Sequence, residues 1–403
     1  MRKPELLAPA GDLDRCKTAI RFGADAVYIG GKQFSLRSRA SNFTIEDIQE
    51  ACRFAKEYGA RIHVTVNMVP HEEDFEGLEE YLKQLEAAGV SAIIVASLSV
   101  MELARKVAPK LEIHCSTQFS VTNVSAIEFL KTRFAIDRVV LARECTLEEI
   151  RTITKEANVE TEVFIHGGMC VNYSGRCTLS NRMTLRDANR GGCAQSCRWF
   201  YHLYEENQEI STKENLFTMG SKDLCTIPIL SEILSTGVTS LKIEGRMKTE
   251  YYIASIVSLY RHLIDEIVEK DGHLEEERQM YYQNELQKIE NRLTCVGFYK
   301  GRAGKESIIT TPNSNQEVNH SYIGRIEDSQ EGIAKISTRN PFALGDTIEV
   351  LSPKKELRTF QVQSIKNELG EYLEESKKPM ASLYIPIPFP VEKEDFLRRI
   401  SHD

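Results

Sequence analysis

The sequence contains no long apolar segment, and this absence limits the kind of protein that it can encode. No run approaches the roughly 20 consecutive apolar residues that a membrane-spanning helix requires. The first residues, MRKPELLAPAGDL, are partly basic but lack the apolar core of a signal peptide. We therefore expect a cytoplasmic protein with no membrane partner.

Common catalytic motifs are also absent. HEEDF at 71–75 lacks the second histidine of the zinc-protease motif H-E-x-x-H, and YSG at 173–175 lacks the first glycine of the hydrolase motif G-x-S-x-G. The sequence has no P-loop and no G-x-G-x-x-G motif. The glycine pair in YIGGK (28–32) follows an expected strand and is only weak evidence for an anion site. No familiar hydrolase or nucleotide site is therefore predicted.

The chain has no net positive charge, and tryptophan is scarce. The formal net charge is −8, and Trp199 is the single tryptophan in 403 residues. This balance argues against a generally basic nucleic-acid-binding protein, although a local basic patch is still compatible with it.

A repeated pattern is present and predicts the fold. FGADAVYIGG (22–31), YGARIHVTVN (58–67), AGVSAIIVAS (88–97) and TGVTSLKIEG (236–245) each join a helical end, a glycine and an apolar strand. Further strands are expected at 5–10, 112–120, 138–144 and 162–167. Eight strand–helix units within roughly 250 residues are typical of a (β/α)8, TIM-type barrel in the α/β class. A doubly wound sheet is the alternative.

The chain is expected to divide into two domains. The barrel would occupy residues 1–297, with a cysteine-rich insertion at 168–216 after its seventh strand. Short strand-like runs such as SYIGRIE, GIAKIST and DTIEVLS predict a small C-terminal β-barrel domain over residues 298–403.

Several expected strands alternate polar and apolar residues, which predicts a polar barrel interior. Active sites of such barrels lie at the carboxyl ends of the strands. The resulting catalytic candidates are Asn67, Gln118, Glu162, His166, Glu244 and Arg246. For the deeper residues, an internal salt-bridge network such as Lys242 with Glu162 or Glu244 is an equally good interpretation.

Four of the ten cysteines lie close together, at Cys170, Cys177, Cys193 and Cys197. Disulfides are not expected in a reducing compartment, so this cluster indicates a metal site. Only the last pair has the short spacing typical of structural zinc, and four thiolates suit an iron–sulfur cluster equally well. The spacing alone leaves both open. Cys225 is a possible substitute ligand, and Cys115 is expected to be structural.

Arginines are interleaved with these cysteines. The segment between Cys170 and Trp199 contains one acid, Asp187, and five arginines: Arg176, Arg182, Arg186, Arg190 and Arg198. Arginine binds phosphate and stacks on bases, and a tryptophan can stack on a flipped base. We therefore consider RNA contacts through Arg186, Arg190, Arg198 and Trp199. The alternative is that the arginines pair with carboxylates elsewhere on the acidic surface.

The stretch EVFIHGGMCVNYSGRCTLS (162–180) resembles the signature of the collagenase-like peptidase family 32, whose mechanism is unassigned. Every signature element is present, from Glu162 through Cys177 to Ser180. ELLAPAG, GADAVYIG and SLKIEGR extend the resemblance over most of the chain, and RDANRGGCAQSCRW resembles the branch that acts on tRNA.

This resemblance implies an enzyme that forms 5-hydroxyuridine at the wobble position of tRNA, or a subunit of one acting with a paralogous chain. It implies a four-iron, four-sulfur (4Fe–4S) cluster on Cys170, Cys177, Cys193 and Cys197, with Cys197 or Cys225 as the fourth ligand. It also implies prephenate as co-substrate, for which Arg37, Arg39 and Arg246 are candidate ligands.

Two other functions are considered. The family name suggests a peptidase, with His166 and Glu162 as the residues to suspect, although a metal with four thiolates leaves no open position for water. A non-catalytic tRNA-binding factor with structural zinc is the second alternative.

Overall fold

Eight parallel strands form a closed barrel in the computed structural model, which describes residues 1–36, 42–289, 292–309, 321–353 and 356–400. The sheet runs in chain order from the first strand to the seventh, and the eighth pairs with both the first and the seventh, which closes the barrel. The strands are β1 (Glu5–Pro9), β2 (Ala26–Gly30), β3 (Arg61–Val66), β4 (Ala92–Val95), β5 (Glu112–Cys115), β6 (Arg138–Val140), β7 (Glu160–Gly167) and β11 (Ser240–Ile243). The predicted (β/α)8 barrel is confirmed.

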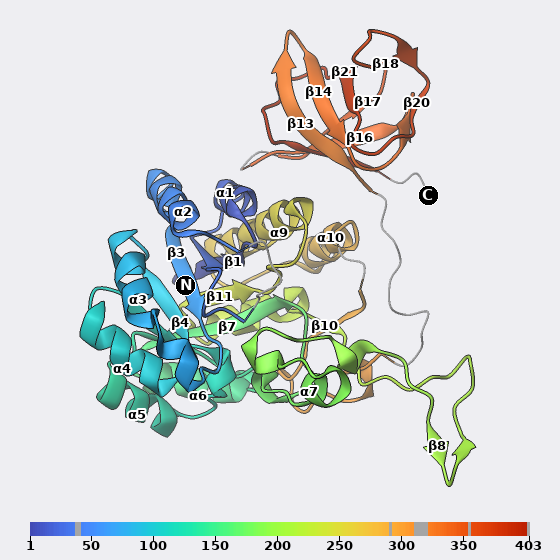
Figure 1. Cartoon of the computed structure of the whole chain (residues 1–403). Coiled ribbons are helices and arrows are strands. Elements are labelled where there is room, and N and C mark those ends of the chain that lie inside the picture. Colours follow the sequence, from blue (N-terminus) through green and yellow to red (C-terminus); the bar gives the residue numbers. More distant parts are fainter. Residues whose placement is uncertain (37–41, 290–291, 310–320, 354–355, 401–403) are drawn as a thin grey trace.

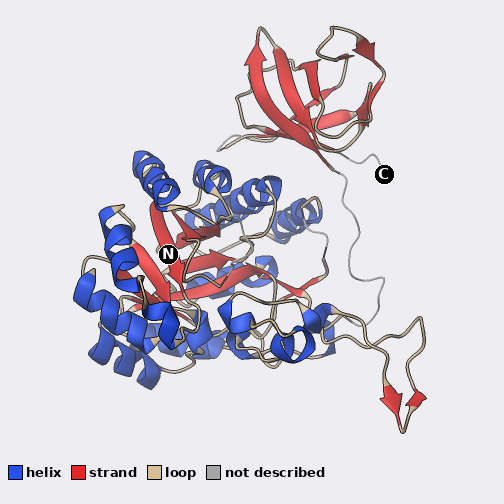
Figure 2. Cartoon of the chain, in the orientation of Figure 1, coloured by secondary structure: helices blue, strands red, loops and turns tan. Residues whose placement is uncertain are grey.

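Helices surround this barrel on its outside (Figures 1 and 2). They are α1 (Leu13–Arg21), α2 (Ile45–Glu57), α3 (Leu78–Ala87), α4 (Leu98–Val107), α5 (Val124–Phe134), α6 (Leu147–Glu156), α8 (Leu230–Ser235), α9 (Glu250–Glu269) and α10 (Glu276–Gln287). Within the described residues, every helix is too short or too polar to span a lipid bilayer.

Local sequence signals explain where these elements begin and end. Capping boxes of Thr44 with Asp47 and of Thr146 with Glu149 start α2 and α6. Gly59 and Gly237 follow α2 and α8 with φ angles of 69° and 83°, a conformation that suits glycine at the end of a helix. The glycine repeat of the sequence is therefore the physical basis of the helix–strand connections.

The two faces of the barrel strands pack in different ways. The large hydrophobic core lies between strands and helices, whereas the apolar cluster formed by Leu7, Ala26, Tyr28 and Ile94 is separate and small. These four residues belong to β1, β2 and β4. The residues that alternate with them along these strands pack in the large core. The space inside the barrel is therefore left mainly to polar and charged side chains.

A long excursion separates β7 from β11. It contains α7 (Leu179–Thr184), the hairpin β8 (Tyr204–Glu205) and β9 (Gln208–Glu209), and the strand β10 (Asp223–Cys225). β10 pairs antiparallel with β7 and parallel with β12 (Thr294–Cys295). Figure 1 shows the β8 hairpin extending away from the barrel. The predicted insertion at 168–216 thus continues into β10, which returns the chain to the barrel.

The C-terminal domain is an antiparallel sheet in the order β17-β16-β22-β13-β14-β21-β18-β19, with a separate pair, β15 and β20. The strands are β13 (Tyr322–Gln330), β14 (Ile333–Thr338), β15 (Phe342–Ala343), β16 (Thr347–Leu351), β17 (Arg358–Gln361), β18 (Ile365–Lys366), β19 (Tyr372–Leu373), β20 (Glu375–Ser376), β21 (Ser382–Pro386) and β22 (Phe396–Arg399). The sheet has a hydrophobic core of its own.

The residues just after the predicted domain boundary at 297 contact the barrel. The Leu147 N–H donates to the Tyr299 carbonyl oxygen (3.0 Å), and the Ile309 N–H donates to the Gly220 carbonyl oxygen (2.9 Å). The described residues 298–309 therefore belong with the barrel. The sheet domain packs on it farther along, where the Tyr322 ring stacks on Tyr251 of α9 with ring centroids 4.4 Å apart.

Candidate functional site

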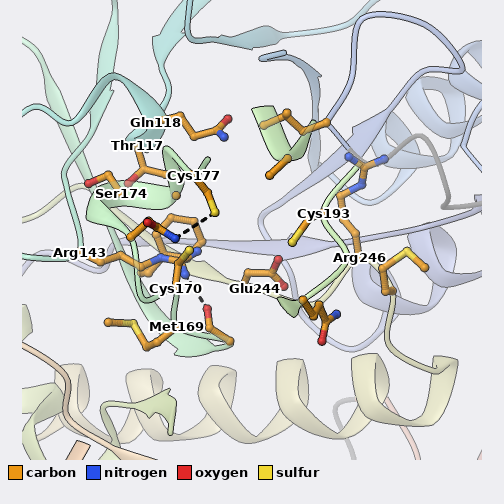
Figure 3. Close-up of a pocket in the computed structure, with 18 of the residues that line it drawn as sticks. Thr117, Gln118, Arg143, Met169, Cys170, Ser174, Cys177, Cys193, Glu244 and Arg246 are labelled. Carbon is orange, nitrogen blue, oxygen red and sulfur yellow. Dashed lines mark hydrogen bonds between the residues drawn. The ribbon is translucent and has the colours of Figure 1, made fainter. Parts of the chain in front are cut away.

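A cavity of about 490 Å³ lies at the carboxyl ends of the barrel strands. One part of its wall follows the strands directly: Asn67 after β3, Gln118 after β5, Arg143 after β6, and Glu244 and Arg246 after β11. The other part comes from the excursion that follows β7 (Figure 3). The cavity is therefore placed where barrel enzymes carry their active sites.

All four clustered cysteines line this cavity. Cys170 follows β7, Cys177 follows a short 3₁₀ turn, and Cys193 and Cys197 come from the later part of the excursion. Burial raises the pKa of the Cys197 thiol, and the neighbouring thiols of Cys170, Cys193 and Cys177 raise it further. The other three cysteines thus lie close enough to Cys197 to affect the ionisation of its thiol.

The four cysteines contribute to the lining of one cavity. Among the described residues, no group of three or more histidine, cysteine, aspartate or glutamate side chains is arranged to hold one metal ion. A structural zinc site would require four ligands around one centre. In addition, Asn172 Nδ2 donates to Cys177 Sγ at 3.0 Å, the type of N–H···S contact that tunes iron–sulfur clusters. Four thiols with a nearby amide donor form a set whose chemistry suits zinc or an iron–sulfur cluster.

Two other cysteines lie apart from this set. Cys225 is buried in β10, and its sulfur lies 4.0 Å from the hydroxyl of Tyr260 on α9. Cys115 is buried in the large core, and burial raises its pKa to about 12. Neither is among the residues that line the cavity.

Arg246 is held at the cavity wall by three hydrogen-bond acceptors. Its guanidinium donates to Ser35 Oγ (3.0 Å), Thr65 Oγ1 (3.2 Å) and Asn42 Oδ1 (2.7 Å), and the residue is buried. A Cβ atom added at Gly30 would lie 2.0 Å from Arg246 Nη2. The YIGGK motif therefore provides space for this guanidinium.

Asn67, Gln118 and Glu244 also line the cavity, as the alternation of the strands predicted. Asn67 Nδ2 donates to Gln118 Oε1 at 3.1 Å, so the two amides hold each other at the mouth of the barrel. Their remaining donors and acceptors are suited to hydrogen bonding with the edge of a base.

The two remaining catalytic candidates lie elsewhere. Glu162 is buried below the cavity, paired with Lys242 (2.8 Å) and Arg138 (3.0 Å). Burial alone would raise the pKa of Glu162, but these two cations outweigh it and lower the pKa to about 2. The salt-bridge interpretation is thus the correct one for Glu162.

His166 was expected to share the inner face with Glu162 and Phe164, and this prediction is wrong. Its Nδ1 lies 3.2 Å from the Tyr260 hydroxyl on α9, on the helix-facing side of the barrel. The pairing of β7 with β11 shifts register between Lys242 and Ile243, which pair with Phe164 and His166. This bulge ends the strict alternation before His166.

The predicted RNA-binding residues have different environments. Arg190 is paired with Asp74 (Nη2 to Oδ1, 3.0 Å), and Arg198 is paired with the buried Asp223 (3.0 Å). Arg198 lines the cavity, whereas Arg186 does not. The Trp199 side chain is exposed. Arg37 and Arg39 lie outside the described residues.

Sequence reasoning missed several cavity residues. Arg143 donates to the Gly168 carbonyl oxygen at 2.5 Å and lies over the Phe164 ring at 3.9 Å. Glu144 accepts hydrogen bonds from the Ser174 N–H (2.7 Å) and hydroxyl (2.6 Å). Their position directly after the sixth strand was an available signal.

The cavity wall carries more positive than negative side chains. Its cations are Arg143, Arg198, Lys242, Arg246, Lys248 and Arg292, against three acids, Glu144, Asp223 and Glu244. An excess of guanidinium and ammonium groups in a partly enclosed site favours an anionic ligand, such as a phosphate or a carboxylate.

Comparison with known proteins gives a consistent assignment. Residues 11–309 match the model of peptidase family U32, and residues 318–398 match the model of the peptidase family U32 C-terminal domain. The chain is 41% identical to tRNA hydroxylation protein P1 of Bacillus subtilis, over 99% of this chain and 95% of that protein. It is 35% identical to a 23S rRNA 5-hydroxycytidine synthase of Escherichia coli, over 90% of this chain and 54% of the relative. It is 31% identical to a collagenase of Porphyromonas gingivalis, over 98% and 97% of the two chains.

Proposed function

This chain belongs to peptidase family U32, and we propose that within this family it hydroxylates RNA at C5 of the wobble uridine of tRNA. Relatives named for tRNA and rRNA hydroxylation support an RNA substrate. The observation that carries the proposal is that four cysteines and an excess of cationic side chains line the same cavity. We place this reaction in the cytoplasm.

In this proposal, Cys170, Cys177, Cys193 and Cys197 hold a 4Fe–4S cluster. Such a cluster, when bound, supplies electron transfer or Lewis-acid chemistry. Cys225 is a weaker candidate for the fourth ligand because it is buried beside Tyr260 and does not line the cavity.

The protein's own residues bind and orient the substrates. The Asn67–Gln118 amide pair faces the edge of the target base, and Arg143, already stacked on Phe164, offers a planar guanidinium beside it. Replacing C5–H by C5–OH is a two-electron oxidation, so an oxidant that accepts two electrons and a source of the oxygen atom must reach the site from solution. We propose that prephenate binds there as a separate co-substrate, with its two carboxylates facing Arg246 and Lys248 on the same wall.

The peptidase function has less support from this site. Its sequence candidates do not act together, because Glu162 is bound in ion pairs below the cavity and His166 lies on the helix side. Among the described residues that line the cavity there is no histidine to serve as a general base.

Mass spectrometry of tRNA nucleosides tests the proposal. A strain that lacks this chain should lose 5-hydroxyuridine and its derivatives, and the wild-type chain should restore them. The Cys170→Ser variant should fail to restore them, whereas Cys52→Ser, the same change on the helix α2, should succeed. Wild-type nucleoside levels in a deletion strain that has no second copy of the gene would contradict the proposal.

A further inference from the structure

One apolar side chain beside the cavity is almost completely exposed. Leu185, which ends α7, is 94% exposed, and Met183 and the charged Arg182 of the same short helix are exposed as well. A single exposed leucine is ordinary on a protein surface. Its support and its neighbours, together with its backbone conformation, make this one a candidate for a function.

The backbone of Leu185 is in the left-handed region, with φ 56° and ψ 25°. A side chain with a Cβ atom disfavours this conformation, and glycine or asparagine usually occupies it. A strained conformation persists only where the surrounding structure imposes it, and such positions cluster at functional sites.

Hydrogen bonds close the loop that carries Leu185, and they involve residues of the cavity wall. Asn189 receives a hydrogen bond from the Cys177 N–H (3.2 Å) and donates one to the Cys177 carbonyl oxygen (2.9 Å). In the first turn of α7, the buried Ser180 donates a hydrogen bond to the Gly192 carbonyl oxygen at 3.2 Å. Leu185 is thus the tip of a loop that is closed at its base by a cysteine of the cavity.

The tip is also close to the cavity. Leu179 and Ser180, in the first turn of α7, line the cavity, as does Ala188 on the returning segment. At 1.5 Å per helical residue, Leu185 lies about 9 Å along the helix from Leu179. This is a distance that one or two nucleotides can cover.

The charges around the tip favour a nucleic acid as its partner. Arg190 and Arg198 are committed to Asp74 and Asp223, and two guanidinium nitrogens of Arg186, Nε and Nη2, are buried, so the exposed Arg182 is the cation of this helix that solvent reaches. An exposed apolar tip close to the exposed Arg182 has the chemistry of a wedge that enters a base stack while an arginine holds a flanking phosphate.

We propose that Leu185 is a wedge that separates the target base from its neighbour in an RNA loop and fills the space that the base leaves. The base then enters the cavity lined by the cysteines. The inference rests on the proposed function, because it assumes an RNA substrate whose base must leave the stack before it reacts.

The test uses Leu185→Asn, because asparagine tolerates the left-handed backbone, so this variant should fold with an unchanged or higher melting temperature. The matched control is Leu369→Asn, which changes another leucine, 83% exposed, in the C-terminal domain. The probe is an RNA hairpin whose unpaired loop carries the target uridine next to 2-aminopurine, a base whose fluorescence rises when it is unstacked.

Wild type and Leu369→Asn should increase the fluorescence on binding and hydroxylate the hairpin. Leu185→Asn should bind it but give no increase, with hydroxylation at least about tenfold slower, because base unstacking is no longer assisted. A hairpin with an abasic site beside the uridine should restore the rate of Leu185→Asn.

Wild-type behaviour of Leu185→Asn would overturn the wedge, and so would a loss of RNA binding without any change in the rate on saturating RNA. If Leu185→Asn acts on RNA as wild type does but no longer binds a protein that wild type binds, the wedge is overturned in favour of a protein-docking role. If wild type itself neither binds nor hydroxylates the hairpin or whole tRNA, the proposed function fails, and the wedge fails with it.

Discussion

At the amino-terminal end of the barrel, Arg138 contacts three carboxylates, those of Glu5, Glu160 and Glu162, and Lys242 contacts Glu162 from above. At the carboxyl-terminal end, five further cations face three acids around a cavity that also contains four thiols. We call these two regions the barrel floor and the barrel mouth.

The difference between floor and mouth teaches how to interpret a charged barrel interior. Buried charges on the floor are compensated by opposite charges within hydrogen-bonding distance, as burial requires. At the mouth the balance is left positive, and the space among the side chains is open. We infer that the floor maintains the fold and that the mouth is the binding site. The predictions below test this division, beginning with the largest effect.

Removing a mouth thiol should abolish the reaction without unfolding the barrel. For Cys193→Ser, an exposed position, we expect product at background level and a free energy of unfolding of the metal-free protein within about 0.5 kcal/mol of wild type. Nucleoside mass spectrometry and urea titration measure the two quantities. A clear loss of stability with full activity would place Cys193 with the structural residues.

Removing the floor cation should have the opposite result. Arg138→Met leaves Glu162 with one cation fewer at a fully buried position, so we expect a loss of about 3–5 kcal/mol in the free energy of unfolding. The double variant Arg138→Met with Glu162→Gln removes both charges and should regain part of this loss. Equal stability of Arg138→Met and wild type would show that the floor network is not structural.

The floor should also set the response to acid. His63 lies against His114 with ring centroids 4.8 Å apart, and burial, followed by His114 and Arg138, lowers the pKa of His63 well below the usual 6.5. The unfolded chain then binds a proton that the folded chain does not, so stability decreases as the pH falls below 6.5. The expected slope is about 1.4 kcal/mol per pH unit for one histidine.

His63→Leu should flatten this slope, and His273→Leu, at an exposed position, should not. Because the pKa of Glu162 is about 2 against a usual 4.5, its contribution is lost only at lower pH, below 4.5. Urea titrations between these limits therefore isolate the histidines. An unchanged slope in His63→Leu would refute this account of the floor.

The smallest expected effect is a change in the salt dependence of RNA binding, which should differ between two arginines near the mouth. Arg182→Ala should weaken RNA binding and reduce its dependence on salt by about one unit of slope, since a phosphate contact is lost. Arg190→Ala should leave the salt slope unchanged, because that guanidinium is already paired with Asp74. Filter binding of tRNA at several salt concentrations measures both slopes. The reverse ranking would show that the Asp74 pair opens when RNA binds.

Much of this division could be predicted from the sequence. The glycine repeat fixes where helices end and strands begin, so it predicts the barrel. The close spacing of four cysteines after the seventh strand predicts that they meet at the mouth. Alternation also identified Asn67, Gln118, Glu244 and Arg246, which line the cavity.

The remaining features depend on contacts that the sequence does not encode locally. The bulge in β7 adds one residue to the strand and turns His166 outward, and an alternation pattern cannot reveal it. The pairing of Arg190 with Asp74 joins residues far apart in the chain. Whether a buried acid such as Glu162 is catalytic or structural depends on the neighbours that folding brings to it.

The central claim, that the mouth of this barrel holds a redox-capable cluster, is tested most directly by the metal content of the protein purified without oxygen. We predict iron and acid-labile sulfide in equal amounts, with the broad visible absorption of an iron–sulfur cluster, in wild type and in Cys225→Ser. Both signals should be lost in Cys170→Ser. Stoichiometric zinc in the wild-type protein, with no visible absorption, would contradict the claim.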